Sequence, residues 1–118
     1  MSKLPFQDLK VIDLSTVLAG PSVGTFFAEL GARVIKIEHP KFGDVTNTWR
    51  LQQESDSSKQ SAYYSSVNFL KENMALDLTI EAHYSLFETQ LKDADIILMN
   101  FKKGDDVTLK VRPENPWA

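Results

Sequence analysis

The stretch that decides the fold lies at residues 10–38 and has the sequence KVIDLSTVLAGPSVGTFFAELGARVIKIE. Its first five residues, 10–14, are mostly apolar and β-prone, which is typical of a short buried parallel strand. Its last six, Arg33–Glu38, form a second run of this kind. A turn and a helical pattern separate the two runs. The stretch therefore predicts a β-α-β unit, whose crossover is almost always right-handed.

The predicted helix of this unit begins at Gly20 and Pro21. Proline is favoured at the first helical position, because the N–H that it lacks would be unpaired there in any case. Gly31 is a natural C-terminal stop. Spacings of three and four residues predict one apolar helix face, made of Val23, Phe26, Phe27 and Leu30.

The middle of the chain is less regular. Residues 40–60 are rich in polar side chains and predict a long loop, of the kind that is usually functional or disordered. Residues 62–69 are ambiguous between helix and strand. Residues 74–78 alternate loosely and predict a strand, and Thr79 after them is a candidate helix cap.

The remaining elements complete an alternating pattern. Residues 80–91 predict a helix, residues 94–99 give the strongest strand prediction in the chain, and residues 105–118 predict an irregular tail with two prolines. Strands that alternate with helices pack as a sheet covered on its faces. The chain is therefore predicted to have an α/β fold, with a Rossmann-like, open, mostly parallel sheet flanked by helices.

Composition narrows the function classes. The chain has 118 residues, the size of one domain or of the front piece of a larger one. Its net charge is −3 with the two signs interspersed, so neither a nucleic-acid nor a membrane partner is predicted. It has no cysteine, and its first residues lack the apolar core of a signal peptide. We expect a cytoplasmic protein.

Ligands of open α/β sheets bind beyond the carboxyl ends of the strands. Three segments meet this condition, at residues 15–20, 39–44 and 100–106. The first runs into a helix N-terminus, where free N–H groups favour phosphate. Its glycines fit neither a dinucleotide fingerprint nor a P-loop. From the residues alone, a tight strand-to-helix turn is the favoured interpretation of Gly20 and Pro21.

Three single side chains have two interpretations each. Asp13 lies within a strand, and a structural acid bonded to loop amides is favoured over a catalytic one. Glu38 is placed to bind a ribose hydroxyl, but a solvated strand-end acid is favoured. His39 is a candidate phosphate or adenine contact, or has no role. His83 has no partner at zinc-ligand spacing, so no metal site is predicted. These residues alone predict no reaction.

Four motifs in order resemble those of family III CoA-transferases, the CaiB/BaiF or formyl-CoA transferase-like family. Residues 9–21, LKVIDLSTVLAGP, resemble the family's opening, and residues 30–38, LGARVIKIE, its next hallmark. Residues 75–78, ALDL, and 94–101, ADIILMNF, resemble two later elements. The resemblance covers about residues 5 to 104, which makes residues 1–118 the expected N-terminal, CoA-binding part of such a protein.

The resemblance implies transfer of CoA from a donor thioester to an acceptor carboxylic acid. In such transferases an Asp carboxylate attacks the thioester and forms an aspartyl-CoA intermediate. That Asp follows the last motif by a further strand, so no catalytic residue is expected within this chain, which is expected to be inactive alone. Both substrates would bind with the help of the C-terminal part, and full-length members are expected to form homodimers. The alternative is a non-catalytic nucleotide- or protein-binding module derived from this family.

The resemblance also implies which residues contact coenzyme A or an acyl-CoA substrate. Those at the first loop would line the coenzyme, one would pack near the adenine, and two would flank the path from pantetheine to phosphate: Val17, Leu18, Ala19, Leu76, Asn100 and Phe101.

His39 is a seventh candidate, at a position where many relatives carry an arginine. Histidine is mostly neutral at pH 7 and cannot form arginine's two-pronged contact with phosphate. Three lysines are candidates to compensate for this lost charge, namely Lys41, Lys102 and Lys103.

Overall fold

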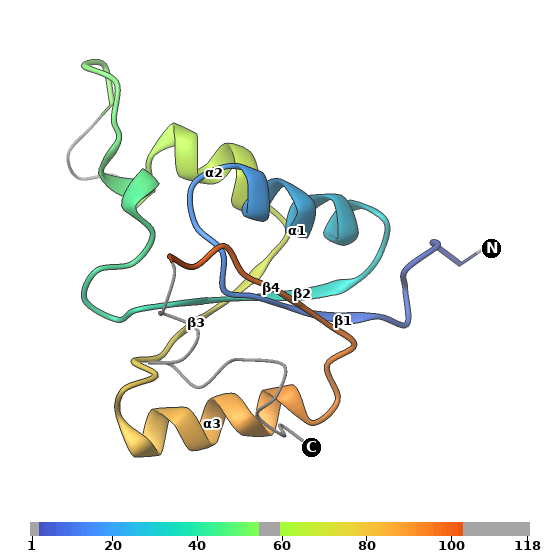
Figure 1. Cartoon of the computed structure of the whole chain (residues 1–118). Coiled ribbons are helices and arrows are strands. Elements are labelled where there is room, and N and C mark those ends of the chain that lie inside the picture. Colours follow the sequence, from blue (N-terminus) through green and yellow to red (C-terminus); the bar gives the residue numbers. More distant parts are fainter. Residues whose placement is uncertain (1–2, 55–59, 103–118) are drawn as a thin grey trace.

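The computed structural model describes residues 3–54 and 60–102. Over these residues four strands form one parallel sheet in the order β3-β2-β1-β4 (Figure 1). This confirms the predicted α/β fold with an open parallel sheet. The elements along the chain are β1 (Lys10–Asp13), α1 (Ala19–Glu29), β2 (Arg33–Glu38), the 3-10 helix η1 (Val45–Thr48), α2 (Ala62–Asn68), β3 (Glu72–Ala75), α3 (Glu81–Leu91) and β4 (Ile96–Leu98).

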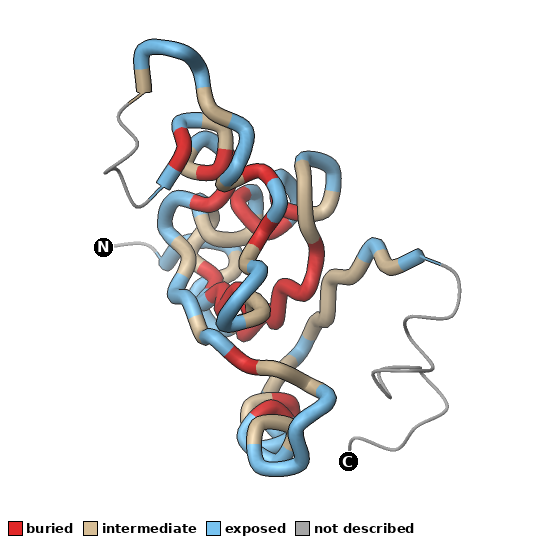
Figure 2. Tube along the Cα trace, turned by 90° about the vertical axis from the view of Figure 1, so that its left-hand side faces the viewer, coloured by how far each residue is buried: buried red, intermediate tan, exposed pale blue. Residues whose placement is uncertain are grey.

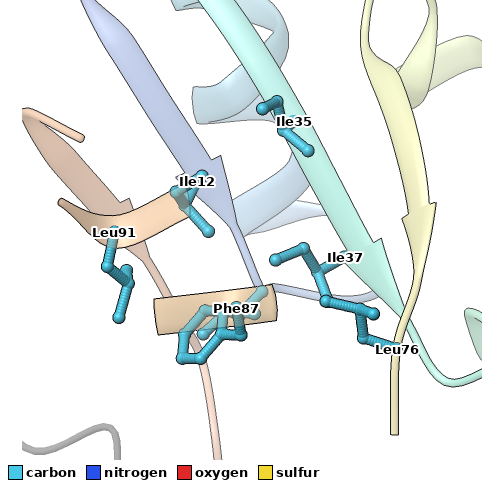
Figure 3. Packing of buried hydrophobic residues seen from close by; sticks show 7 residues of the cluster. Ile12, Ile35, Ile37, Leu76, Phe87 and Leu91 are labelled. Carbon is cyan, nitrogen blue, oxygen red and sulfur yellow. The ribbon is translucent and has the colours of Figure 1, made fainter. Parts of the chain in front are cut away.

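The sheet lies between two helical layers, with α1 and α2 on one face and α3 on the other (Figure 1). Successive side chains of a strand point to opposite faces, so each strand supplies both layers. Ile12 and Ile35 pack with Phe87 in the cluster beneath α3 that Figure 3 shows. Val11 and Val34 belong to a second cluster on the face of α1. Burial is deepest in the two central strands: all of β1 and all of β2 except its two end residues are buried, and buried stretches are red in Figure 2.

The predicted apolar face of α1 is wrong for Val23 and Phe26, whereas Phe27 is half-buried and packs against the cluster of Val11 and Val34. The buried residues of this helix are Pro21, Gly24 and Thr25. Val23 and Phe26 are 43% and 53% exposed. The cause is a close approach between helix and sheet, because a Cβ on Gly24 would lie 2.8 Å from a carboxylate oxygen of β1. Small residues therefore face the sheet at this point, and Val23 and Phe26 face outward.

Two segments for which the sequence predicted no definite element contain short helices. The described part of the predicted 40–60 loop contains η1, so it is not wholly irregular. Residues 62–69 form helix α2 up to Asn68. Its N-cap is Ser61, whose Oγ accepts a hydrogen bond from the N–H of Tyr64 at 3.0 Å. A serine in this position satisfies a helical N–H that would otherwise lack a partner.

Strand β3 begins two residues before the predicted 74–78. Its first residue, Glu72, pairs with Ile35 of β2. It is an edge strand whose side chains are mostly exposed, so an apolar pattern marks its position poorly. Thr79 does not cap α3. The N-cap is Ile80, which makes no side-chain cap hydrogen bond.

The last two predicted elements are confirmed. Helix α3 lies within residues 80–91 and buries Phe87 and Leu91 against the sheet (Figure 3). Strand β4 lies within residues 94–99 and pairs with β1. The predicted tail at residues 105–118 lies outside the described residues.

Lys10 joins α3 to the beginning of β1. Its Nζ donates to the carbonyl oxygen of Gln90 at 2.9 Å and to Oδ1 of Asp93 at 2.5 Å. A cation at the C-terminal end of a helix compensates unpaired carbonyl groups. This contact lies at the amino end of β1, away from the strand ends where ligands of such sheets bind.

Candidate functional site

A cavity of about 310 Å³ opens at the carboxyl ends of β1, β2 and β3. Apolar side chains form much of its wall, as in most small-molecule sites. They come from the ends of three strands and from the segment after β4, and include Leu14, Ile37, Leu76, Leu78 and Phe101. The position agrees with the rule for ligand sites of open α/β sheets.

The charged or titratable groups in the cavity wall are Glu38, His39 and Asp77. The described residues that line the cavity include neither lysine nor arginine. The wall itself therefore favours an uncharged group such as a nucleobase, a sugar or an amide chain. A phosphate would need cations outside this wall.

His39 is held in a single orientation by its own turn. Its Nδ1 accepts hydrogen bonds from the backbone N–H groups of Lys41 at 3.0 Å and Phe42 at 3.2 Å. Its Nε2 lies 3.1 Å from Oδ2 of Asp77. These partners assign the proton of the neutral ring to Nε2, which donates to the carboxylate. The ring also stacks on Phe42, with centroids 4.5 Å apart. Both nitrogens are thus engaged within the protein.

Asp77 organises the segment between β3 and α3. Its Oδ1 accepts from both the N–H and the hydroxyl of Thr79, at 3.0 and 2.6 Å. These bonds, followed by the contact with His39, lower the pKa of the Asp77 carboxyl. The backbone N–H of Asp77 donates to Nδ1 of His83 at 2.9 Å. His83 is therefore a half-buried residue of α3 that holds the segment leading into its own helix.

The side chain of Asn100 holds the loop between β1 and α1 by two hydrogen bonds. Asn100 donates from Nδ2 to the carbonyl oxygen of Thr16 at 2.7 Å and accepts the Thr16 N–H at 3.0 Å. Val17 follows with φ of 74°, in the left-handed region that a β-branched residue rarely adopts. Such strain persists only where surrounding contacts determine the conformation. Here the Asn100 clamp supplies two of these contacts.

The predicted coenzyme contacts divide into two groups. His39, Leu76 and Phe101 lie together in the cavity wall. Thr16 also lines the cavity, although the sequence did not single it out. The other four predicted residues are not among the described lining residues; Asn100 acts as the clamp on Thr16, and the loop residues Val17, Leu18 and Ala19 lie just beyond it.

Asp13 is a structural acid, as predicted. Its Oδ1 accepts from the N–H of Ser15 at 2.9 Å and also from the Ser15 hydroxyl. Its Oδ2 lies 2.7 Å from Nζ of Lys71, and both side chains are buried. Leu70, with φ of 66°, turns the chain just before Lys71. The sequence interpretation missed this buried ion pair, because the partner lies 58 residues away.

A second buried ion pair lies beside the first. Nζ of Lys36 is 2.9 Å from Oδ2 of Asp44, and both side chains are at most 1% exposed. The contact is an ion pair without the alignment of a hydrogen bond. The other carboxylate oxygen accepts from the N–H and the hydroxyl of Thr46 at 2.9 and 2.8 Å. Burial alone would raise the pKa of Asp44, but the Thr46 and Lys36 contacts outweigh burial and lower it.

The lowered pKa of Asp44 predicts an acid-dependent loss of stability. The folded protein favours the carboxylate, so this group stabilises the fold above its ordinary pKa of 3.8 and ceases to do so as the pH falls through the folded value. Asp44→Asn should be less stable than the unchanged protein at neutral pH. The difference should shrink below about pH 4. Urea unfolding of both proteins across this range measures it, and a difference that stays constant would contradict the assignment.

Glu38 is tied to α2, so the favoured prediction of a solvated acid is wrong. Its Oε1 accepts from the hydroxyl of Tyr64 and from Nδ2 of Asn73, the latter at 3.0 Å. Burial, together with the bond to Glu38, raises the pKa of the Tyr64 hydroxyl. This contact joins one wall of the cavity to the helical layer behind it.

Within residues 3–54 and 60–102, no group of three or more His, Cys, Asp or Glu side chains lies close enough to hold a metal ion. No helix of that part of the chain has the length and apolar character needed to cross a bilayer.

Comparison with known sequences shows the family to which the chain is related. The model of CoA-transferase family III matches residues 6–117. Acetyl-CoA:oxalate CoA-transferase from Acetobacter aceti is 42% identical over 102 residues, which cover 86% of this chain and 25% of that protein. Succinate–glutarate CoA-transferase from Agrobacterium fabrum is 35% identical over 104 residues, which cover 86% of this chain and 26% of that protein. This chain thus spans about a quarter of the length of these relatives.

Solved structures agree as well. A CaiB/BaiF family protein from Brucella suis superposes with a TM-score of 0.86 at 33% identity, over 97% of this chain and 30% of that one. The protein Rv3272 from Mycobacterium tuberculosis superposes with a TM-score of 0.79 at 27% identity, over 94% of this chain and 29% of that one. The chain belongs to CoA-transferase family III and corresponds to a short N-terminal portion of its relatives.

Proposed function

We propose that this chain forms the CoA-binding part of an enzyme that transfers CoA from an acyl-CoA to a carboxylic acid. The observation that carries the proposal is the apolar cavity at the carboxyl ends of β1, β2 and β3. Relatives named for acetyl-CoA and oxalate, or for succinate and glutarate, support a CoA thioester as donor and a carboxylic acid as acceptor.

The cavity suits the uncharged parts of coenzyme A. Leu76 and Phe101 offer apolar surface to the adenine or the pantetheine chain, and the Glu38 carboxylate is a hydrogen-bond acceptor for a ribose hydroxyl. The phosphates would lie outside this wall. Lys41 and Lys102 are exposed and lie close in sequence to wall residues, so we assign the phosphate contacts to them. Lys41 lies between His39 and Gly43, and Lys102 directly follows Phe101.

The chain's proposed contribution is binding rather than chemistry. A carboxylate nucleophile must be free to reach the thioester carbonyl carbon. Asp13 and Asp44 are fully buried and paired with lysines, and Asp77 is bonded to Thr79 and His39. None of these three suits the role. We propose that the nucleophile comes from the remaining part of a family protein, which would also complete the expected homodimer.

A calorimetric titration of the chain with CoA tests the binding proposal. Thr16 is a half-buried residue of the cavity wall, and its backbone makes the hydrogen bonds with Asn100. Thr16→Trp should fill the cavity and weaken CoA binding at least tenfold. Thr89→Trp is the matched control, because Thr89 is exposed on α3 outside the described cavity wall.

Equal affinity in the two tryptophan variants would contradict the assignment of the cavity. No heat with the unchanged chain up to millimolar CoA would instead favour the second candidate, a non-catalytic protein-binding module. The observation that favours this candidate is the exposed apolar surface of α1 at Val23 and Phe26.

A further inference from the structure

Lys36 joins the two loops that border the cavity. It lies on β2 with a side chain that is 1% exposed. Its Nζ donates to the carbonyl oxygen of Ser15 at 2.8 Å and lies 2.9 Å from Oδ2 of Asp44. One buried ammonium group therefore contacts the segment after β1 and the segment after β2 at the same time.

Both anchor points lie next to residues of the cavity wall. Leu14 and Thr16 line the cavity, and Ser15 lies between them in the chain. Gly43 also lines the cavity, and Asp44 follows it directly. Gly43 has φ of 59°, a left-handed conformation that glycine adopts without strain. A movement at either anchor point would therefore move the wall.

Lys36 and Asp44 themselves lie behind the cavity. Neither is among its described lining residues. The neighbours of Lys36 in β2, Ile35 and Ile37, point to the face of α3 and pack in the cluster beneath it. Because strand side chains alternate, Lys36 points to the opposite face, which α1 and α2 cover (Figure 1). The ion pair is thus placed to shape the cavity without touching a ligand in it.

The contacts of Asp44 continue along a chain of hydrogen bonds that returns to β2. Asp44 accepts from Thr46, whose carbonyl oxygen accepts from the Ser61 hydroxyl at 2.7 Å. Ser61 Oγ accepts the N–H of Tyr64, and the hydroxyl of Tyr64 donates to Glu38. Glu38 lies two residues after Lys36 and lines the cavity. The bonded circuit therefore begins and ends on one strand.

We infer that Lys36 and Asp44 are positioning residues, which set the affinity of the cavity for its ligand by fixing the 15–20 and 39–44 loops against each other. The inference rests on the proposed CoA-binding function. Two observations carry it: the buried ammonium group bridges both loops, and the bonded circuit from Asp44 ends on the cavity residue Glu38.

The test measures CoA affinity by calorimetry for the unchanged chain, Lys36→Met, Asp44→Asn and a control, Lys10→Met. The control removes one cation and breaks contacts at the amino end of β1, so it matches Lys36→Met in charge. We expect both Lys36→Met and Asp44→Asn to bind CoA at least tenfold more weakly, and Lys10→Met to bind it unchanged.

The signs of the two effects separate positioning from simple attraction. CoA is an anion, so loss of a lysine would weaken its attraction and loss of an aspartate would strengthen it. Positioning predicts weaker binding in both variants. Tighter binding by Asp44→Asn, or the same weakening in Lys10→Met, would overturn the inference.

Folding is checked separately for each variant by near-UV circular dichroism. If Lys36→Met fails to fold, the isosteric Asp44→Asn carries the test. Amide hydrogen exchange adds a local readout, and folded Asp44→Asn should exchange the Ser15 and Thr16 amides faster in the absence of ligand. The two proposals fail in different ways. Absence of CoA binding to the unchanged chain refutes the proposed function, whereas unchanged affinity in folded Asp44→Asn refutes the positioning role alone.

Discussion

Lys71→Met is expected to lower the free energy of unfolding by about 3–5 kcal/mol, because it leaves the Asp13 carboxylate buried without its cation. Lys71 Nζ also donates to the carbonyl oxygen of Pro21 at 2.8 Å and to Oδ1 of Asn68 at 2.9 Å. The single change therefore removes contacts to β1, α1 and α2. Urea unfolding followed by circular dichroism measures the loss.

The control for this prediction is an exposed ion pair of the same sheet. Arg33 and Glu72 are in contact at 2.6 Å, but both side chains are more than half exposed. Arg33→Met should therefore cost no more than about 1 kcal/mol. The double variant Asp13→Asn, Lys71→Met should recover much of the stability, because no buried charge then lacks a partner. Similar losses for the Arg33 and Lys71 variants would show that burial of the pair is not the cause.

Gly20→Ala is expected to destabilise the protein by about 1–3 kcal/mol, the usual cost of overpacking. A Cβ at this position would lie 2.2 Å from Cβ of Ser15. That atom cannot rotate away, and the Ser15 backbone is held by Asp13 and Lys36. The loop that carries Val17 would have to shift. CoA affinity should fall together with stability.

The sign of this effect is the informative part. Gly20 lies in the first turn of α1, and helix propensity alone would make alanine more stable than glycine by about 1 kcal/mol within a helix. Ser22→Ala, at an exposed position of the same helix, is the control and should be close to neutral. A gain in stability from Gly20→Ala would mean that the loop after β1 does not lie as described. Thermal unfolding of the two variants decides between these outcomes.

The sequence predicted the sheet well because its evidence was local. The apolar runs at Lys10–Asp13 and Ile96–Leu98 are buried or half-buried in the sheet, and the helical spacing of Phe87 and Leu91 marks the residues that α3 buries. Such periodicity depends only on neighbours in the chain. The predicted position of the edge strand β3 was two residues too late in the sequence, since its exposed side chains carry little of this pattern.

The faces of α1 could not be predicted from its own residues. The pattern of Val23 and Phe26 indicated the inner face, but what lies beneath Gly24 is an ion pair. The apolar cluster on this face of the sheet is contacted by Phe27 and Ala28 instead. The two members of the ion pair, Asp13 and Lys71, are 58 residues apart in the sequence. Gly24 lies against both, where a Cβ would come within 3.1 Å of the lysine. Only the folded arrangement shows why a small residue is needed there.

The candidate site was predicted in part. Leu76 and Phe101 do meet His39 in one cavity wall, as the resemblance implied for residues far apart in the sequence. The role of Lys36 was missed, because a lysine within an apolar strand is usually a solvated side chain. The alternation of side chains along β2 could have revealed the buried lysine, because it places Lys36 on the same face as the apolar Val34. A lysine on a buried face requires a carboxylate partner, and Asp44 is that partner.

The clamp between Asn47 and Ser61 has a consequence for how the family can vary. The N–H of Ser61 donates to Oδ1 of Asn47 at 2.6 Å, so the chain departs from and returns to nearly the same point. When the two ends of a segment are pinned, doubling its length adds only about 0.6 kcal/mol of closure entropy. Insertions between these two residues are therefore expected to cost the sheet little stability.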